Sequence, residues 1–325
     1  MRRGLVFGKF MPLHRGHELL IDTALSQADN VTIAVYDSQP KGEYPDMSIE
    51  KRLGWLSMLY PEVDAIVPVE DPHAGDPNAD DEKYAQEYAD ELAYLGHFDL
   101  VFTSEPGYEK FVQALGARHV IVDAARELVP ISGTQIREDV YTHRGWVDPR
   151  VYGSLIKKVV FVGTESTGKS TLARRMAEEL NTVWTHEYGR ELWVDQGGGS
   201  FHDHLPMARR QYGREEAAKH QARKFVFCDT NAWTTLQWSL MAYGTADARL
   251  YDLVEKTKEE YIWIVCAPDF GWVDDGIREL RGRKALDFQK TQVEDLNRRG
   301  IKWHYVEGPV EHRVKQVKEI IGVKT

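Results

Sequence analysis

The chain has 325 residues, 42% of them hydrophobic, which is enough for two globular domains with ordinary cores. Its formal net charge of −10 argues against general nucleic-acid binding, which requires a basic face. No apolar run approaches the roughly 20 residues of a membrane-spanning helix, and the apolar stretch before Lys9 is too short for a signal-peptide core. We therefore expect a cytoplasmic protein without a membrane span. The two cysteines, Cys228 and Cys266, lie in apolar runs and are expected to be buried strand residues.

Short apolar runs alternate with helical patterns through the first half of the chain. The predicted strands are residues 5–7, 31–35, 65–69, 100–102 and 119–122, and the predicted helices are residues 16–28, 48–60, 80–95 and 108–115. Alternating strands and helices are typical of a parallel sheet with helices on both faces. The first half is therefore predicted to be an α/β domain.

Residues 8–20 bring Lys9, His14 and His17 together at the end of the first predicted strand. As zinc ligands the histidines lack a third partner, and metal-binding helices use an i, i+4 pair instead of this spacing. A plain turn with two exposed histidines is a second interpretation. The third is an anion pocket, in which the imidazoles donate hydrogen bonds to phosphate oxygens and Gly16 lets the backbone approach the ligand. The missing zinc ligand favours the anion pocket.

A second segment, residues 131–137, places small hydroxyl side chains at an apparent helix start. Ser132 and Gln135 match a capping box, which is a purely structural interpretation. A capped helix start also presents free N–H groups to an anion, so both interpretations can hold. Arg137, one turn into the helix, would add a guanidinium fork for terminal phosphates.

Residues 142–158 interrupt the alternation with glycine, proline and aromatic residues. We place the domain boundary there, which gives domains of residues 1–150 and 151–325. Beyond it, the predicted strands are residues 157–162, 183–185, 225–228, 261–267 and 301–306, and the predicted helices are residues 169–180, 289–299 and 310–321. The second half is therefore predicted to be another α/β domain.

The start of the second domain matches the P-loop pattern G-x-x-x-x-G-K-S/T between a predicted strand and a predicted helix. Glycines let successive backbone N–H groups point at phosphate oxygens, and the helix N-terminus adds partial positive charge. Lys169 would reach the β- and γ-phosphates, and Ser170 would bind Mg²⁺. A glycine-rich turn with a capping serine is the structural alternative. The loop comprises Gly163, Thr164, Glu165, Ser166, Thr167, Gly168, Lys169, Ser170 and Thr171.

Three features after the P-loop bear on the acceptor of a transferred phosphoryl group. An apolar strand ends in Asp229, as expected for an acid that organises Mg²⁺, although a strand-end turn residue is the alternative. Glu187 and Arg190 follow the strand after the P-loop helix, where kinases of small hydroxyl substrates often hold their acceptor. Arg278 and Arg281 lie in a glycine-punctuated stretch that suits a lid over phosphates, and a solvated helix face would also explain them.

The motif G-x-F-x-P-x-H-x-G-H near the first strand, with I-S-x-T-x-x-R late in the same domain, resembles the nucleotidyltransferases of the nicotinamide, pantetheine and cytidylyl group. Behind the P-loop, E-Y-G-R-E at residues 187–191, D-T at residues 229–230 and W-V-x-D-G-x-R at residues 272–278 resemble ribosylnicotinamide kinases. The two domains in this order resemble the bifunctional, NadR-like NMN adenylyltransferase/ribosylnicotinamide kinases. The resemblance covers nearly the whole chain.

This resemblance implies a Rossmann-like nucleotidyltransferase domain with a parallel sheet, followed by a P-loop kinase domain with a second parallel sheet. The kinase would phosphorylate nicotinamide riboside to NMN with ATP or GTP and Mg²⁺. The transferase would join NMN to ATP, giving NAD and pyrophosphate. The expected partners are therefore small molecules: nicotinamide riboside, NMN, ATP and NAD.

The resemblance also implies roles for the transferase residues. His14 and His17 would be catalytic and stabilise charge on the transferred phosphate. Trp55 is either a residue that stacks on the nicotinamide ring or a core residue of its helix. The residues implied to bind ATP and its phosphates are Gly8, Lys9, Phe10, Ser132, Thr134 and Arg137.

In the kinase domain, the residues of the P-loop would hold the nucleotide phosphates. Ser170 and Asp229 would bind Mg²⁺, and Glu187 and Asp229 are the catalytic candidates. Which of these two acids accepts the proton stays open. The residues implied to contact the substrate or form a lid are Arg190, Arg278 and Arg281.

Some members of the family carry an N-terminal helix-turn-helix repressor domain. The first predicted strand begins near Leu5, so we expect no such domain here, and operator binding is not carried over. The acidic segment of residues 71–91 matches no role.

Two functional alternatives stay open: an NAD-sensing regulator whose transferase site binds without turnover, and a nucleotidyltransferase for another phosphorylated substrate. The phosphate donor and the relative activity of the two sites do not follow from the sequence. The oligomeric state does not follow either, and a homo-oligomer is compatible with the sequence.

Overall fold

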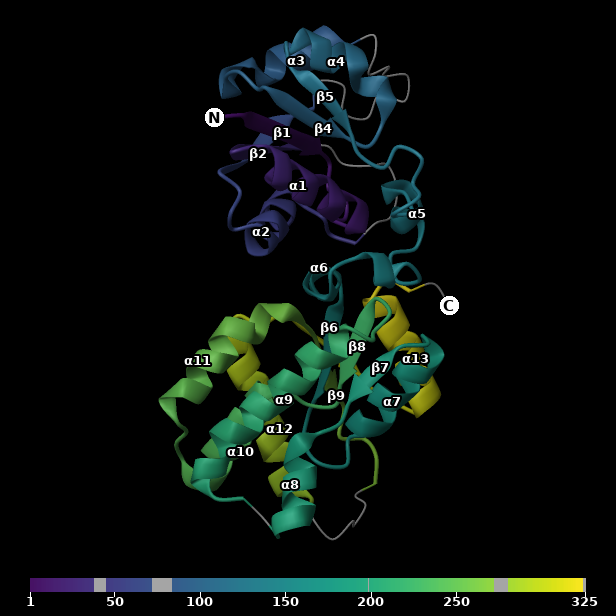
Figure 1. Ribbon diagram of the computed structural model, residues 1–325. Coiled ribbons are helices and arrows are strands. Elements are labelled where there is room, and N and C mark those ends of the chain that lie inside the picture. The colour runs from purple at the N-terminus through teal and green to yellow at the C-terminus, as the bar shows by residue number, and fades with distance from the viewer. Residues whose placement is uncertain (38–44, 72–83, 198, 272–279, 324–325) are drawn as a thin grey trace. The chain divides into compact units, whose positions relative to one another are not determined.

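The computed structural model describes residues 1–37, 45–71, 84–197, 199–271 and 280–323. The chain divides into two compact units, Met1–Leu155 and Ile156–Thr325. Each unit is built on one five-stranded parallel sheet with helices on both faces (Figure 1). The prediction of two α/β parallel sheets is thus confirmed. Within the described residues, no helix has the length and apolar character needed to cross a membrane.

In the first unit, β1 lies at the centre of a sheet with the order β3-β2-β1-β4-β5. Because all pairings are parallel, the carboxyl ends of the strands meet at one edge, and the loop after β1 opens at the middle of that edge. The strands are β1 (Arg3–Gly8), β2 (Asn30–Asp37), β3 (Ala65–Glu70), β4 (Leu100–Thr103) and β5 (Arg118–Ile121). The helices are α1 (Arg15–Gln27), α2 (Ile49–Leu59), α3 (Ala85–Leu92), α4 (Glu109–Ala114), α5 (Gly133–Glu138) and α6 (Pro149–Ser154).

The central strand β1 is buried on both faces. Leu5 and Val6 point to opposite sides of the sheet, and both are fully buried. Helices α3 and α4 pack onto the face that contains Leu5, and α1 and α2 cover the other face (Figure 1). Pro68, which has no N–H to donate, is tolerated because β3 is an edge strand.

In the second unit, β6 is the central strand of a sheet with the order β10-β9-β6-β8-β7. Strands β6, β8 and β7 are neighbours, and Cys228 at the end of β8 pairs with Thr185 at the end of β7. The segments that follow these three strands therefore meet at one edge. The strands are β6 (Lys157–Val162), β7 (Val183–Thr185), β8 (Phe225–Cys228), β9 (Tyr261–Cys266) and β10 (Trp303–Val306). The helices are α7 (Lys169–Glu179), α8 (Tyr188–Gln196), α9 (His204–Lys219), α10 (Ala232–Tyr243), α11 (Ala248–Thr257), α12 (Arg283–Arg298) and α13 (Val310–Ile320).

Helices α7 and α13 cover one face of the second sheet, where Met176 and Val317 pack against Phe161 and Phe227. Helices α9 to α12 lie on the other side of the sheet (Figure 1). Both cysteines are buried free thiols at the ends of β8 and β9, as predicted. The prediction missed α8 to α11 entirely and began α12 six residues too late, at residue 289 instead of Arg283.

Candidate functional sites

A cavity of about 350 Å³ lies in the first unit. It is lined by the loop after β1, the start of α1 and the start of α5. The structure thus brings together the two segments that the sequence analysis singled out for phosphate binding. The expected residues that line the cavity are Gly8, Lys9, Phe10, His14, His17, Ser132, Thr134 and Arg137.

His14 is the N-cap residue of α1, and its Nδ1 accepts a hydrogen bond from the backbone N–H of Gly16 at 3.0 Å. In the neutral ring the proton is therefore on Nε2. A Cβ atom at Gly16 would lie 2.9 Å from His14 Cε1, and one at Gly133 would lie 3.2 Å from His14 Nε2. Both glycines are needed for the backbone to approach the imidazole this closely.

His17 lies beside His14, with ring centroids 3.9 Å apart, and the Phe10 ring lies 4.8 Å from His17. Burial, followed by the positive charges of Arg137 and Arg126, lowers the pKa of His14 to about 4. Burial, followed by the effects of His14 and Arg137, also holds the pKa of His17 well below its usual value. Both imidazoles are therefore neutral at neutral pH, and His14, whose proton is on Nε2, can donate a hydrogen bond to an anion.

The positive charge of this cavity comes from Lys9, Arg126 and Arg137, which all line it. Arg137 donates to the Met11 carbonyl at 3.1 Å and to Thr134 Oγ1 at 2.9 Å, so its guanidinium is held at the start of α5. The sequence analysis missed Arg126, because no motif marks the loop after β5. The acids Asp71, Glu105 and Asp123 also line the cavity, and Lys9 pairs with Asp71 at 3.4 Å and Arg126 with Glu105 at 3.5 Å. An anion in this cavity would therefore compete with these carboxylates for the cations.

Ser132 and Gln135 form the predicted capping box at the start of α5. Ser132 Oγ accepts from the Gln135 N–H at 3.1 Å, and Gln135 Oε1 accepts from the Ser132 N–H at 2.9 Å. The structural interpretation of this pair is therefore confirmed. Ser132 also lines the cavity, so the binding interpretation stays compatible with the cap.

The buried Arg52 supports the loop after β1 from behind. It donates to the carbonyls of Lys9 at 2.9 Å and Tyr36 at 2.7 Å, which joins the ends of β1 and β2. Arg52 lies on α2 three residues before Trp55. Nothing in the sequence distinguishes this arginine from an exposed one on the same helix.

Trp55 is a core residue in this structure. Its side chain is 3% exposed, and its indole N–H donates to Ser154 Oγ at 2.9 Å. Trp55 is not among the described residues that line the cavity. Its placement matches the core interpretation, and it gives no support to ring stacking on nicotinamide.

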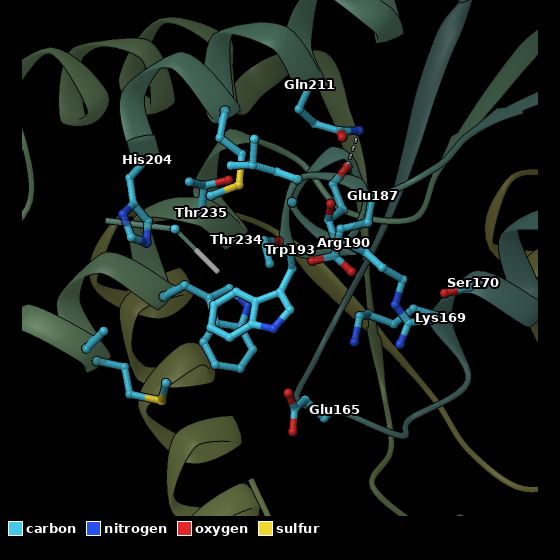
Figure 2. Close-up of a pocket in the computed structure, with 18 of the residues that line it drawn as sticks. Glu165, Lys169, Ser170, Glu187, Arg190, Trp193, His204, Gln211, Thr234 and Thr235 are labelled. Carbon is cyan, nitrogen blue, oxygen red and sulfur yellow. Dashed lines mark hydrogen bonds between the residues drawn. The ribbon is translucent and has the colours of Figure 1, made fainter. Parts of the chain in front are cut away.

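A second cavity, of about 410 Å³, lies in the second unit (Figure 2). The P-loop joins β6 to α7 and forms one wall of this cavity. Gly163 and Thr164 do not line the cavity but shape the base of the loop. The expected residues that do line it are Glu165, Ser166, Thr167, Gly168, Lys169, Ser170, Thr171, Glu187 and Arg190.

Two glycines of the P-loop adopt backbone angles that other residues rarely adopt. Gly163 has a φ of 140°, and a Cβ atom there would lie 3.0 Å from the Cys266 carbonyl oxygen. Gly168 has a φ of 80°, and a Cβ atom there would lie 2.9 Å from the Phe270 ring. Lys169 Nζ donates to the Thr164 carbonyl at 2.8 Å, so the lysine closes the loop on itself.

Two residues far along the chain hold the P-loop in place. The side-chain amide of Gln289 accepts from the Thr164 N–H at 2.8 Å and donates to the Cys266 carbonyl at 2.8 Å. Arg313 is buried and donates to the Thr167 carbonyl at 2.7 Å. The sequence analysis missed both, because neither belongs to a recognisable motif.

Glu187 and Asp229 follow neighbouring strands and influence each other's ionisation. Burial raises the pKa of Glu187 to about 7, helped by the negative charge of Asp229 and opposed by Lys169. Asp229 is 3% exposed and lies outside the cavity lining. Burial also raises its pKa, while Lys169 and a hydrogen bond from Ser170 act in the opposite direction. Glu187 is therefore the acid that faces the cavity.

Ser170 and Asp229 fit the oxygen ligands that Mg²⁺ prefers. Asp229 Oδ1 is buried and makes no hydrogen bond within the described part of the chain. No cluster of three or more His, Cys, Asp or Glu residues suited to a metal occurs among the described residues. A cation at this position would therefore take most of its ligands from water and phosphate, which is usual for Mg²⁺.

The half of the second cavity away from the P-loop is lined by large apolar and aromatic side chains (Figure 2). Trp193 from α8 and His204 from α9 lie on the side opposite Lys169 and Ser170 (Figure 2). Trp238, Met241 and Tyr243 from α10 complete this half. The sequence analysis missed these residues, because it predicted none of the helices that carry them.

Of the two other arginines that the sequence analysis singled out, the structure describes one. Arg278 lies outside the described residues, and Arg281 is not among the described residues that line the second cavity. The N–H of Leu280, which precedes Arg281, donates to Glu165 Oε2 at 2.8 Å. This segment therefore reaches the edge of the P-loop.

Two family models match the chain, in the order in which the units occur. A cytidylyltransferase-like model matches residues 5–139, and an AAA domain model matches residues 158–313. The first match spans the loop after β1 and the start of α5. The second spans the P-loop, Glu187, Asp229 and Arg313.

Curated relatives match both units together. The trifunctional NAD biosynthesis/regulator protein NadR of Salmonella typhimurium is 29% identical over 357 aligned residues, which cover 98% of this chain and 83% of that protein. The protein of the same name from Escherichia coli is 29% identical over 334 residues, covering 94% of this chain and 78% of that protein.

The fold is also similar to solved structures. A crystal structure of a NadR protein in complex with NR has a TM-score of 0.60 at 23% identity and covers 99% of this chain and 97% of its own. A crystal structure of a NadR protein in complex with NAD and AMP-PNP has a TM-score of 0.59 at 23% identity. That match covers 100% of this chain and 97% of the other. At this identity the likeness concerns the fold. Matches to both units, in this order and over nearly the whole chain, identify it as a NadR-like protein, in which a cytidylyltransferase-like domain precedes a P-loop domain.

Proposed function

We propose that this chain is a bifunctional enzyme of NAD biosynthesis. Its second unit phosphorylates nicotinamide riboside to NMN, and its first unit adenylylates NMN with ATP to give NAD and pyrophosphate. The observation that carries the proposal is the presence of two separate cavities suited to phosphate in one NadR-like chain. The product of the second unit would be the substrate of the first.

In the kinase reaction, the 5′-hydroxyl oxygen of the riboside attacks the γ-phosphorus of ATP or GTP. The bond from that phosphorus to the β–γ bridging oxygen breaks, and the nucleoside diphosphate leaves. Glu187 lines the cavity and has a pKa raised to about 7, so it is suited to accept the hydroxyl proton. Lys169 and Arg190, which also line the cavity, would neutralise charge on the transferred group.

Ser170 and Asp229 would hold Mg²⁺, which when bound neutralises charge on the β- and γ-phosphates. This assignment leaves Glu187 as the proton acceptor and Asp229 as a metal ligand. It is supported by the position of Asp229 outside the cavity lining and by its buried Oδ1, which makes no hydrogen bond among the described residues. Trp193 and Trp238 offer flat apolar surfaces that suit a planar nicotinamide ring.

In the transferase reaction, a phosphate oxygen of NMN attacks the α-phosphorus of ATP, and the bond to the α–β bridging oxygen breaks. No protein nucleophile takes part. His14 and His17 would donate hydrogen bonds to the reacting phosphate, and Lys9 and Arg137 would hold the phosphates that leave as pyrophosphate. The neutral state of both imidazoles supports the donor role.

The direct test is to incubate the full chain with nicotinamide riboside, ATP and Mg²⁺ and to follow NMN and NAD by mass spectrometry. We expect NMN to appear first and NAD to follow. If the kinase accepts GTP as phosphate donor but the transferase does not, a reaction with GTP in place of ATP gives NMN alone. Tight binding of NAD without steady-state turnover of NMN would support a regulatory protein instead. Conversion of a different phosphorylated acceptor, with none of NMN, would also reject the proposal.

A further inference from the structure

Helix α9 carries buried polar residues where a surface helix usually buries apolar ones. Gln211 is 2% exposed, and Glu215, one turn later, is fully buried. Gln211 also lines the second cavity. The proposed reaction assigns no role to either residue. Burying such groups is costly unless each is hydrogen-bonded, so their partners are informative.

The side-chain amide of Gln211 joins the two segments that carry the acids of the site. Its Oε1 accepts from the Tyr188 N–H at 2.9 Å, and its Nε2 donates to the Thr230 carbonyl at 3.4 Å. Tyr188 directly follows Glu187, and Thr230 directly follows Asp229. Gln211 therefore forms a bridge between these two segments.

We propose that Gln211 is a positioning residue of the kinase site, whose side-chain amide sets the spacing of Glu187 and Asp229. The inference rests on the proposed function of this site and adds a residue to it. Strands β7 and β8 end before the acids, and the last backbone bond between them joins the Asp229 N–H to the Thr185 carbonyl at 3.1 Å. Beyond that bond, the bridge through Gln211 continues the connection.

Spacing matters here because both acids serve one reaction. Glu187 is proposed to accept the hydroxyl proton, and Asp229 is proposed to hold the metal that neutralises the phosphates. Both must lie at fixed positions relative to the reacting groups, and small misplacements of such groups are costly to the rate. Gln211 ties together the two segments that carry them.

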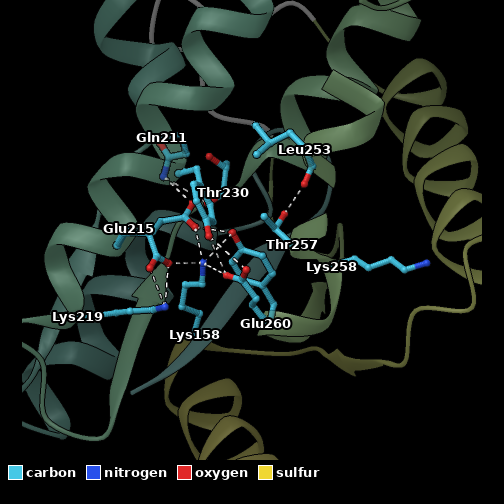
Figure 3. A network of polar contacts seen from close by, with 12 residues as sticks. Lys158, Gln211, Glu215, Lys219, Thr230, Leu253, Thr257, Lys258 and Glu260 are labelled. Carbon is cyan, nitrogen blue, oxygen red and sulfur yellow. Dashed lines mark hydrogen bonds and ion pairs between the residues drawn. The ribbon is translucent and has the colours of Figure 1, made fainter. Parts of the chain in front are cut away.

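A buried network keeps the Gln211 amide in the required orientation. Glu215 Oε1 accepts from Gln211 Nε2 at 3.4 Å, and Glu215 Oε2 accepts from the Tyr261 hydroxyl at 2.5 Å. Because Gln211 Nε2 faces Glu215 Oε1 and the Thr230 carbonyl, Gln211 Oε1 faces the Tyr188 N–H. Figure 3 shows Gln211, Glu215 and Thr230 converging in this way.

The network is anchored by Lys158 at the start of β6 (Figure 3). Lys158 is 1% exposed and pairs with Glu215 at 3.6 Å, Glu216 at 3.0 Å and Glu260 at 2.6 Å. Burial alone would lower the pKa of Lys158, but Glu215 and its neighbours raise it above the usual range. The lysine therefore stays charged and ties Glu215 to the central strand of the sheet.

The experiment compares three variants of the full chain with the wild type. Gln211→Leu removes the bridge, and Gln211→Glu keeps an oxygen to accept from the Tyr188 N–H but loses the amide donor. Gln237→Leu is the matched control, because Gln237 is equally buried in the same unit but donates to Asp295, away from the cavity. We expect kcat for NMN formation to fall about 10- to 100-fold in Gln211→Leu, the size of effect that misplaced catalytic groups produce. Gln211→Glu should also lower kcat, because its carboxylate would lie against Glu215 Oε1 and the Thr230 carbonyl, which are both acceptors.

The split between kcat and KM separates positioning from general damage. Gln211→Leu should lower kcat and leave KM for ATP unchanged, because the P-loop is not displaced, and Gln237→Leu should change neither. Unchanged kcat in a folded Gln211→Leu protein would overturn the inference. Equal losses of kcat in Gln211→Leu and Gln237→Leu would also overturn it.

Hydrogen exchange gives a readout that does not depend on activity. The Tyr188 N–H is protected by Gln211, so peptides containing this amide should exchange faster in Gln211→Leu than in Gln237→Leu. Equal exchange would contradict the bridge. If the wild type makes no NMN but Gln211→Leu still exchanges the Tyr188 amide faster than Gln237→Leu, the proposed function is rejected and the bridge stands.

Discussion

The proposed roles of His14 and His17 are those of neutral hydrogen-bond donors to phosphate. Burial removes their charge, while Lys9, Arg126 and Arg137 bring positive charge to a lining that also contains Asp71, Glu105 and Asp123. A bound phosphate would favour the protonated imidazole and raise both pKa values. The histidines can therefore gain charge as negative charge develops on the reacting phosphate.

The low pKa of His14 has a consequence for stability. Its pKa falls from 6.5 in the unfolded chain to about 4 in the folded unit, so between these values the unfolded chain binds a proton that the folded chain does not. Stability is therefore lost as the pH falls through this window, on the order of 2 kcal/mol between pH 7 and pH 4.5. Urea unfolding of the first unit at several pH values measures this loss.

The variant His14→Gln cannot take up this proton, so its unfolding free energy should depend less on pH across the window. His97→Gln, which changes an exposed histidine of the same unit, is the comparison, and a pH dependence altered equally in both variants would not be specific to His14. If the free energy of unfolding depends on pH in the same way in wild type and His14→Gln, His14 is not held neutral by the fold.

Glu187 is predicted to be the proton acceptor of the kinase. A base must be ionised to act, so the rate of NMN formation should rise as the pH passes through about 7 and then level off. Glu187→Gln should lower kcat about 10²-fold or more and remove this inflection. Initial rates between pH 5.5 and pH 9 test both points. A variant that keeps half of the wild-type rate would exclude Glu187 as the base.

The P-loop depends on helix α12 for two of its hydrogen bonds. Gln289 on this helix satisfies the Thr164 N–H and the Cys266 carbonyl. Gln289→Leu leaves both buried groups unpaired, which should destabilise the second unit by about 2 to 4 kcal/mol and raise KM for ATP in the kinase reaction. Denaturant unfolding and initial rates measure these two effects.

Gln292→Leu is the matched control on the same helix. Gln292 is equally buried, but its side-chain amide makes no hydrogen bond within the described part of the chain. Replacing it should leave KM unchanged and be neutral or stabilising. If both variants were destabilised equally, the support of the loop by Gln289 would be disproved.

The elements that the sequence predicted are those with simple patterns. Buried parallel strands are continuous apolar runs, and the P-loop and the histidine motif follow such strands directly. Helices α9 and α10 lack a regular apolar stripe. Helix α9 buries Gln211 and Glu215, and α10 is buried around most of its first two turns. Periodicity therefore could not reveal either helix.

At the scale of the whole molecule, the motif residues could be located from the sequence, but their partners could not. Thr164 and Gln289 are 125 residues apart, and Thr167 and Arg313 are 146 residues apart. Such contacts depend on the order of strands in the sheet, which a single sequence does not specify. Trp55 shows the reverse case, since its aromatic side chain suggested a ligand contact and the fold buries it.

Two independent active sites are proposed to operate in this one chain. Lys169→Ala removes a cation from the second cavity, and His17→Ala removes a donor from the first. The measurement is the rate of NMN formation from nicotinamide riboside and the rate of NAD formation from supplied NMN and ATP, for both folded variants. We predict that Lys169→Ala loses the first reaction by about 10²-fold or more and keeps the second, and that His17→Ala shows the reverse. Loss of both reactions in either folded variant would show that the two sites are not independent.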